Sequence, residues 1–326
     1  MNKSKLHESA EQQRRNAWDT YWEGTKQAST YKGGETESHI LMQKWNVIFT
    51  SIANQHTHML DIASGYGILA SLAYKSLEPR NTSITCVDIS KSALEAIEKK
   101  VPHVNTKVCD AAQLPFDDAS FTLITSQFGV EYAGMDAFRE AGRVLQPGGL
   151  IAFVSHLTDG GIHKECNANR AAVEDFIRTD FLNLTHNLLE TKMTPGFSQL
   201  DIKTRMECLK PAIEATVDIV KKYGRNVAGG SIDKVFMDAA KISRSSENFD
   251  KTEVLSWLRK MESELIAYSE RMRSMCEASL DQTDIQHIKN ILLENNIHVN
   301  TVEKLPFVEG GENCAWLITA QRGSSG

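Results

Sequence analysis

Two glycines in this 326-residue chain stand where a short apolar run gives way to helical spacing. Gly65 and Gly67, with Ala70 three residues further on, match the G-x-G-x-x-A pattern of loops that let a backbone bend tightly and approach a ligand. Asp88 follows Gly67 by 21 residues, the spacing at which a carboxylate binds ribose hydroxyls. The pattern predicts a site for an adenosine-containing ligand. A tight strand-to-helix turn without a ligand is the alternative.

Short β-branched runs alternate with helical runs around this loop. Such an alternation predicts a parallel sheet with crossover helices, whose ligands bind beyond the carboxyl ends of the strands. The expected strands are 58–63, 83–89, 106–111, 121–127 and 150–156, and the expected helices are 69–77, 90–100 with Ser90 as N-cap, and 136–145.

The pattern changes after residue 156. Helical spacing runs through 157–280, interrupted at 194–196 and 226–230, and predicts an all-helical insertion. A helix over 284–296 and two strands over 299–307 and 314–321 follow, and the turn residues 309–313 between these strands predict an antiparallel hairpin at the sheet edge.

Further motifs surround the glycine loop in a fixed order. Asp61 lies four residues before Gly65, Asp110 lies at the end of the third expected strand, and a Leu-x-Pro-Gly-Gly turn precedes the fifth. Over 58–156 and 283–321 the chain therefore resembles the class I methyltransferases that use S-adenosyl-L-methionine (SAM). A nicotinamide domain, which also binds an adenosine, gives no reason to expect the Asp110 segment or the Pro-Gly-Gly turn.

The resemblance implies an α/β fold: a Rossmann-like seven-stranded, mostly parallel sheet with an antiparallel last strand, plus the all-helical insertion. We expect an N-terminal helical lid segment at 1–57, a SAM-binding core at 58–156 and 281–322, and a flexible tail at 323–326. The insertion at 157–280 is expected to bind substrate or to form a dimer.

The resemblance also implies a role for single positions. Asp61 would lie near the ammonium group of the methionine part, and Asp88 would take both ribose hydroxyls. Ile89 would pack on the adenine, and Asp110 with Ala111 would contact its amino edge. The expected cofactor residues are Asp61, Ala63, Ser64, Gly65, Gly67, Asp88, Ile89, Asp110, Ala111, Gln127 at the methionine end, and Tyr31.

Two positions depart from the family pattern. Ala63 replaces the commonest first glycine of the loop, and Thr122 stands where Asp often follows Phe. Because alanine adds only a methyl group, we expect a slightly altered loop. Thr122 touches no expected ligand contact, and we expect it to be neutral.

Methyl transfer from a sulfonium is an in-line displacement, so the protein must exclude water, align the acceptor and in some cases remove a proton. His156 ends the fifth expected strand and is the best-placed base, because histidine titrates near neutrality. Glu131 and Tyr132 follow the fourth strand and could orient a polar acceptor or act as a second base. The alternatives are a histidine that only hydrogen-bonds a loop and a glutamate that only favours a helix dipole.

Aromatic residues also gather before the first strand. Trp18, Trp22 and Tyr31 are candidates for a lid over the cofactor, as segments in this position often are in the family. Their alternative role is to pack an N-terminal helix onto the sheet.

Composition bounds the partners. The net charge of −6 and the absence of a basic stripe with interleaved aromatics disfavour nucleic acid. The six cysteines form no CxxC pair, and no compact His, Cys, Asp and Glu cluster has metal spacing, so no metal is expected. A polar start and the lack of a long apolar run predict no membrane span and a cytoplasmic protein.

The predicted function is SAM-dependent methyl transfer to an oxygen or nitrogen of a small-molecule acceptor, held under the helical insertion. A homodimer formed through the insertion is the competing use of those helices. A non-catalytic SAM-binding subunit or sensor is the first alternative function, and an NAD-dependent oxidoreductase is the second.

Overall fold

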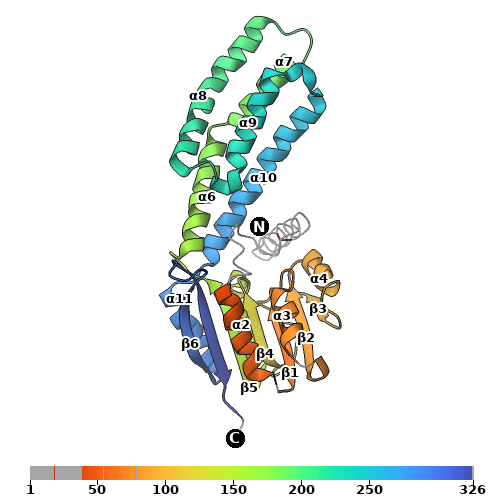
Figure 1. Ribbon diagram of the computed structural model, residues 1–326, viewed down its shortest axis with the longest axis vertical. Helices are drawn as coiled ribbons and strands as arrows, with labels where there is room; N and C mark the ends of the chain where they lie inside the picture. Colours follow the sequence, from red (N-terminus) through yellow and green to blue (C-terminus); the bar gives the residue numbers. More distant parts are fainter. Residues whose placement is uncertain (1–17, 19–38, 54, 78, 325–326) are drawn as a thin grey trace, which may run out of the picture. The chain divides into compact units, whose positions relative to one another are not determined.

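The computed structural model describes residues 18, 39–53, 55–77 and 79–324 (Figure 1). The chain folds into two compact units. The sheet unit comprises Met1–His163 and Glu277–Gly326, and the helical unit comprises Lys164–Cys276. Each unit has its own hydrophobic core and is described separately.

The sheet unit is built on seven strands in the order β3-β2-β1-β4-β5-β7-β6. β1 to β5 pair in parallel, and β7 is antiparallel to both of its neighbours. The predicted fold class and edge hairpin are confirmed. The strands are β1 Thr57–Ile62, β2 Thr82–Asp88, β3 Asn105–Val108, β4 Phe121–Gln127, β5 Leu145–His156, β6 Ile297–Pro306 and β7 Asn313–Arg322.

The Pro-Gly-Gly turn expected before the fifth strand lies inside β5 instead. Leu145 already pairs with Phe121, and the register then shifts before Leu150 pairs with Leu123. Gly148, with φ of +78°, lets the backbone bulge between these two pairs. The strand therefore begins five residues earlier than the sequence pattern indicates.

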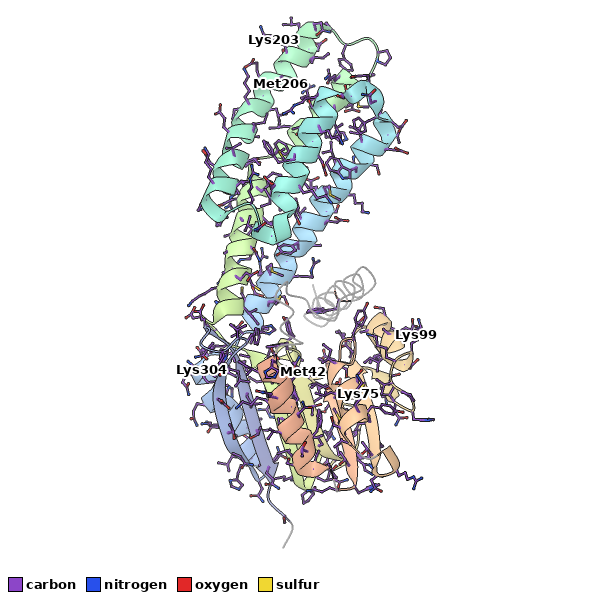
Figure 2. All side chains as sticks on the ribbon, viewed as in Figure 1. Met42, Lys75, Lys99, Lys203, Met206 and Lys304 are labelled. Carbon is purple, nitrogen blue, oxygen red and sulfur yellow. The ribbon has the colours of Figure 1, made fainter. Side chains whose placement is uncertain are left out.

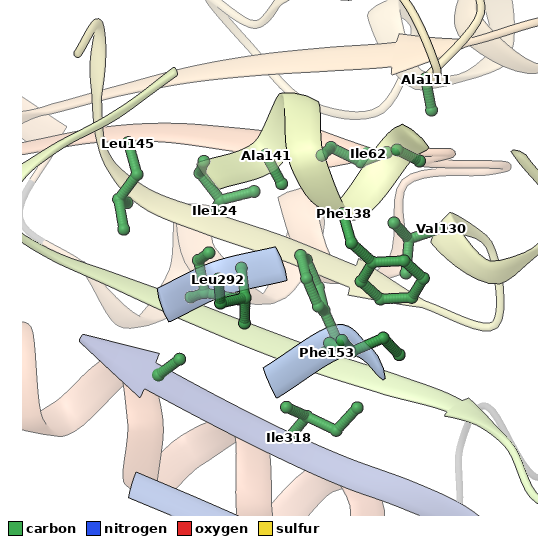
Figure 3. Close-up of a cluster of buried hydrophobic side chains, with 14 of the residues drawn as sticks. Ile62, Ala111, Ile124, Val130, Phe138, Ala141, Leu145, Phe153, Leu292 and Ile318 are labelled. Carbon is green, nitrogen blue, oxygen red and sulfur yellow. The ribbon is translucent and has the colours of Figure 1, made fainter. Parts of the chain in front are cut away.

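Helices cover both faces of the sheet (Figure 1). One core joins the sheet to α5 and α11 and includes Phe138, Phe153 and Ile318 (Figure 3). The other core joins it to α2, α3 and α4 through residues such as Trp45 and Met59. These helices are α2 His39–Ile52, α3 Ile68–Ser76, α4 Lys91–Glu98, α5 Met135–Val144 and α11 Gln282–Glu294.

Local capping explains where two of these helices begin. Ser90 caps α4 as predicted, because its side chain accepts a hydrogen bond from the Ala93 amide at 3.3 Å. Asp281 and Asp284 form a reciprocal capping box at the start of α11. Both helices therefore start at fixed points next to strands of the sheet.

The helical unit contains only helices and their connections, as the predicted insertion requires. Its core includes Phe176 and Phe181, with Met206 of α8 packed against it while Lys203 on the same helix is exposed (Figure 2). None of the described helices combines the length and apolar composition that a membrane-spanning segment requires. The helices are α6 Gly161–Arg178, α7 Phe181–Lys192, α8 Gln199–Tyr223, α9 Ser231–Arg244 and α10 Lys251–Ala278.

Candidate functional site

The sheet order places the predicted site residues in a row at one edge. Asp110 follows β3, Asp88 ends β2, Asp61 is the penultimate residue of β1, Gln127 ends β4 and His156 ends β5. These strands are neighbours in that order, and their parallel pairing brings all five carboxyl ends to the same side. The strand order reverses between β1 and β4, where ligands of open α/β sheets bind.

The glycine loop joins β1 to α3 and depends on Gly67. This residue has φ of +71°, and an added Cβ would lie 2.8 Å from Cγ1 of Ile97. Gly67 is also the N-cap of α3 and offers no side chain to the first amides of that helix. Gly65 likewise adopts a positive φ of +51°. The loop therefore presents backbone amides at a helix start, where an anionic or polar ligand group is favoured.

Ala63 and Ser64 fix the other half of the loop. Ala63 adopts φ of +51°, which costs an alanine about 1 kcal/mol and explains why glycine is common at this position. Ser64 donates from its amide to the Val87 carbonyl at 3.0 Å, and its hydroxyl donates to the Asp61 carbonyl at 2.7 Å. The loop is thus tied to both β1 and β2.

Asp88 is buried and holds the loop directly. One carboxylate oxygen accepts from the Gly65 amide at 2.9 Å, and the other accepts from the Ser90 amide at 2.9 Å. A carboxylate oxygen can accept more than one hydrogen bond, which is the chemistry that ligand hydroxyls require.

The residues that follow β2 and β3 complete the part of the site around Asp88. Ile89 is half-buried directly after Asp88, and Asp110 accepts from the Ala112 amide at 2.9 Å. Ala111 belongs to the hydrophobic core, so its backbone, rather than its methyl group, is what it can offer a ligand.

Asp61 is a buried carboxylate with 1% of its surface exposed. Desolvation raises its pKa from 3.8 to about 7, opposed by the hydrogen bond from Thr125 and by the nearby Ser64 hydroxyl, and the charge of Asp88 raises the pKa further. The Thr125 hydroxyl donates to the carboxylate at 2.9 Å. A buried carboxylate with this hydroxyl donor and no cation among its described partners is suited to binding an ammonium group.

Gln127 lies at the end of β4, between this carboxylate and His156. Its side-chain oxygen accepts from the indole nitrogen of Trp45 on α2. The amide is thereby held by the helix that covers this face of the sheet.

His156 and Glu131 form a buried pair at the other end of the row. Nδ1 of His156 lies 2.8 Å from Oε1 of Glu131, and the same oxygen accepts from the His156 amide at 2.9 Å. Their side chains are 3% and 0% exposed. Oε2 of Glu131 has no hydrogen-bond partner in the described part of the chain. Glu131 belongs to the 3-10 helix η3, Val130–Ala133, so its position after β4 brings it onto the end of β5.

Aromatic rings surround this pair. The Phe128 ring lies 4.6 Å from the His156 ring, centroid to centroid, with an interplanar angle of 40°. Tyr132 meets His156 edge-on at 5.8 Å, and Trp18 meets Tyr132 edge-on at 5.3 Å. The ring of Phe307, which directly follows β6, lies 6.0 Å from the Phe128 ring, centroid to centroid. Trp18 therefore reaches the site, whereas Trp22 and Tyr31 lie outside the described residues.

Phe128 and Ser126 lie in the segment after the fourth strand where the family often has substrate-facing residues, but the sequence pattern predicts no individual role for either. Phe128 adopts φ of +55°, which the sequence does not predict for a phenylalanine. Thr122, the second departure from the family pattern, accepts from the His58 amide at 2.8 Å and so joins β4 to β1.

Comparison with known proteins finds methyltransferases. Residues 60–153 match the family described as methyltransferase domain. A demethylmenaquinone methyltransferase of Chlamydia trachomatis is 36% identical over 114 residues, which cover 34% of this chain and 49% of that protein. A ubiquinone/menaquinone biosynthesis C-methyltransferase of Rickettsia rickettsii is 37% identical over 108 residues, covering 30% of this chain and 44% of that protein.

The chain thus spans about half the length of the curated relatives it matches. Among solved structures, geranyl diphosphate C-methyltransferase from Streptomyces coelicolor A3(2) has a TM-score of 0.46 at 11% identity, covering 94% of this chain and 98% of that one. The sequence match over 60–153 runs from β1 into β5, the strands that carry the row of site residues.

Proposed function

We propose that this chain, whose sheet unit carries a class I SAM-dependent methyltransferase domain, transfers the methyl group of SAM to a small-molecule acceptor. The observation that carries the proposal is the row of Asp88, Asp61 and His156 at the carboxyl ends of neighbouring strands. In that order the three side chains would bind the ribose, bind the ammonium group and accept a proton. The family match favours this function over the NAD-dependent oxidoreductase.

The residues present fit SAM. Asp88 has lone pairs for the ribose hydroxyls, and the buried Asp61 carboxylate would be neutralised by the ammonium of the methionine part. Ile89 and Asp110 would hold the adenine, and Gln127 would lie toward the methionine end. SAM brings its methyl group already activated on a sulfonium, so the protein has to position the acceptor and exclude water.

His156 is the proposed general base. The hydrogen bond from Nδ1–H to Glu131 fixes the ring and its tautomer, which leaves Nε2 as the proton acceptor. Nε2 would take the proton of an acceptor O–H or N–H, and the acceptor's electron pair would form the bond to the transferred methyl carbon. Tyr132, edge-on to His156, would border the acceptor.

The acceptor is proposed to be a small organic molecule with an ionisable group. The relatives are named for quinone substrates and, in one case, for C-methylation, and the half-buried rings of Phe128 and Tyr132 suit a flat acceptor. A base that ionises such a molecule serves transfer to oxygen, nitrogen or a ring carbon. For the helical unit, which follows β5 in the chain, substrate binding or dimer formation stays a prediction.

The first experiment measures binding of S-adenosylhomocysteine and of NAD by calorimetry. We expect micromolar binding of S-adenosylhomocysteine and none of NAD, and we expect Asp88→Asn to weaken binding at least tenfold. Asp136→Asn is the matched control, because Asp136 is an exposed residue on α5. Binding of NAD without S-adenosylhomocysteine would overturn the proposal.

The second experiment separates an enzyme from a non-catalytic SAM-binding subunit. The protein is incubated with SAM labelled on its methyl group and with phenolic, quinol and amine acceptors, and labelled products are separated and identified. Turnover of one acceptor class supports the proposal. Tight cofactor binding without turnover of any of them would favour a SAM sensor.

A further inference from the structure

Two non-glycine residues with left-handed backbones follow neighbouring strands at the candidate site. Ala63 follows β1 with φ of +51°, and Phe128 follows β4 with φ of +55°. β1 and β4 are paired neighbours, with Asp61 opposite Thr125. Strained residues of this kind persist only where surrounding contacts hold them, and they cluster at functional sites.

The two turns pack on each other with almost no spare space. Gly129 follows Phe128, and an added Cβ there would lie 2.5 Å from Cβ of Ala63 and 2.9 Å from its carbonyl oxygen. The buried hydroxyl of Ser126 donates to the Ile62 carbonyl at 2.8 Å and accepts from the Val130 amide at 3.0 Å. The residue before Ala63 is therefore bonded, through one side chain, to the residue after Gly129.

The turn at Phe128 and Gly129 also contacts His156, the proposed base. The Phe128 amide donates to the Val154 carbonyl of β5 at 2.7 Å. This hydrogen bond fixes the backbone of Phe128 next to that strand. The ring then lies 4.6 Å from the His156 ring. The titratable side chains in contact with His156 in the described part of the chain are Glu131 and Tyr132, both from η3, which begins directly after Gly129.

We propose that Phe128 is a positioning residue for His156, and that the Phe128–Gly129 turn couples the position of the His156 ring to occupancy of the glycine loop. This inference rests on the proposed function. A ligand that moves Ala63 must also move Gly129, because no gap separates them. The displacement passes to the Phe128 ring and to η3, the two elements that hold His156.

The test uses the ring-current effect of Phe128 on the imidazole C–H signals of His156, in two-dimensional NMR of the full chain. The His156 signals are assigned by their loss in His156→Gln. In the wild type, saturating S-adenosylhomocysteine is expected to shift them. In Phe128→Leu they are expected to lie downfield of the wild type, and the ligand-induced shift is expected to fall by at least half.

Three further variants keep the result interpretable. Phe128→Tyr retains an aromatic ring and is expected to restore the wild-type shift. Phe128→Gly removes the ring but suits the left-handed backbone, so it tests the inference if Phe128→Leu fails to fold. Phe116→Leu removes a phenylalanine that packs on Phe121 and is expected to leave the His156 signals unchanged.

Kinetics provide a second readout. Phe128→Leu is expected to lower kcat about tenfold while the affinity for S-adenosylhomocysteine changes less than twofold. An unchanged ligand-induced shift in Phe128→Leu and Phe128→Gly would overturn the inference, although the proposed function would stand. Absence of S-adenosylhomocysteine binding to the wild type would instead overturn the proposed function.

Discussion

The row of candidate site residues at the carboxyl ends of the strands runs from β2 to β5, and its two ends are built differently. At the end near β2 the ligand-binding geometry comes from the backbone, through the positive φ of Gly67 and the amides held by Asp88. At the end near β5 it comes from side chains, because Glu131 reaches across 25 residues to fix His156. The first end needs the loop after β1 and the end of β2, whereas the second exists only when β4 and β5 are paired. A substitution at the first end should therefore act mainly on cofactor affinity, and one at the second mainly on turnover.

The largest expected effect tests the side-chain end. His156→Gln is expected to lower kcat about 100- to 10,000-fold, because the proton acceptor is lost. Affinity for S-adenosylhomocysteine is expected to stay within twofold. His287→Gln, on α11, is the control and should keep wild-type turnover. Turnover of His156→Gln equal to the wild type between pH 6 and 9 would contradict base catalysis.

The next largest effect is the pH dependence of the free energy of unfolding of the ligand-free protein, which the raised pKa of Asp61 predicts. Its pKa of about 7 in the native state lies above the usual 3.8. Between these two pH values the native state therefore holds a proton that the unfolded state has lost. The free energy of unfolding should therefore fall as pH rises, by about 3 kcal/mol from pH 5 to pH 8. Asp61→Asn, which cannot ionise, should lack this loss.

Urea unfolding at several pH values measures the difference. Asp136→Asn, at an exposed carboxylate, should retain the wild-type pH dependence. A wild-type protein with a flat profile between pH 5 and 8 would show that Asp61 ionises without cost.

Gly67 tests the backbone end. Gly67→Ala should destabilise the protein about 2 kcal/mol more than Gly230→Ala, since both residues have left-handed backbones but only Gly67 has Ile97 in the path of the added carbon. Gly67→Ala should also weaken S-adenosylhomocysteine binding at least tenfold. Unfolding midpoints and calorimetry provide both numbers, and equal losses in the two variants would place the whole cost in backbone strain.

The smallest effect concerns Ala63. Ala63→Gly relieves a left-handed alanine and should raise the free energy of unfolding by about 0.5 to 1 kcal/mol. Ala119→Gly makes the same change at φ of +51° in a turn away from the site. If the free energy of unfolding rises less in Ala63→Gly than in Ala119→Gly, the difference measures how much the Ala63 methyl group, packed over Gly129, stabilises the protein.

Much of the sheet unit could be predicted because its signals are local. The five parallel strands and the edge hairpin follow from runs of β-branched residues and turn residues, and the Ser90 cap follows from one hydroxyl before an apolar helix. The bulge in β5 could not be predicted, because the pairing of Leu145 with Phe121 competes with the turn preference of Pro147 and Gly148. Tertiary pairing prevailed there.

The candidate site also has a part that local sequence signals predict and a part that depends on tertiary contacts. The positions of Asp61, Asp88 and His156 at strand ends follow from element order alone. The His156–Glu131 hydrogen bond and the rings around it do not, since they depend on how η3 turns back over β5. The unusual backbone of Phe128 has no sequence signature, because propensity disfavours it and only its contacts sustain it.

The place of β7 between β5 and β6 has a consequence for synthesis of the chain. β5 ends at His156, and its partner on that side begins at Asn313, roughly 160 residues later. At about 5 to 20 residues per second, the ribosome needs about 10 to 30 s to deliver that partner. During this interval the buried segment Ile151–Val154 presents an open strand edge, which favours association between nascent chains. The helical unit emerges complete in the same interval, so it can fold while the sheet still waits for its last two strands.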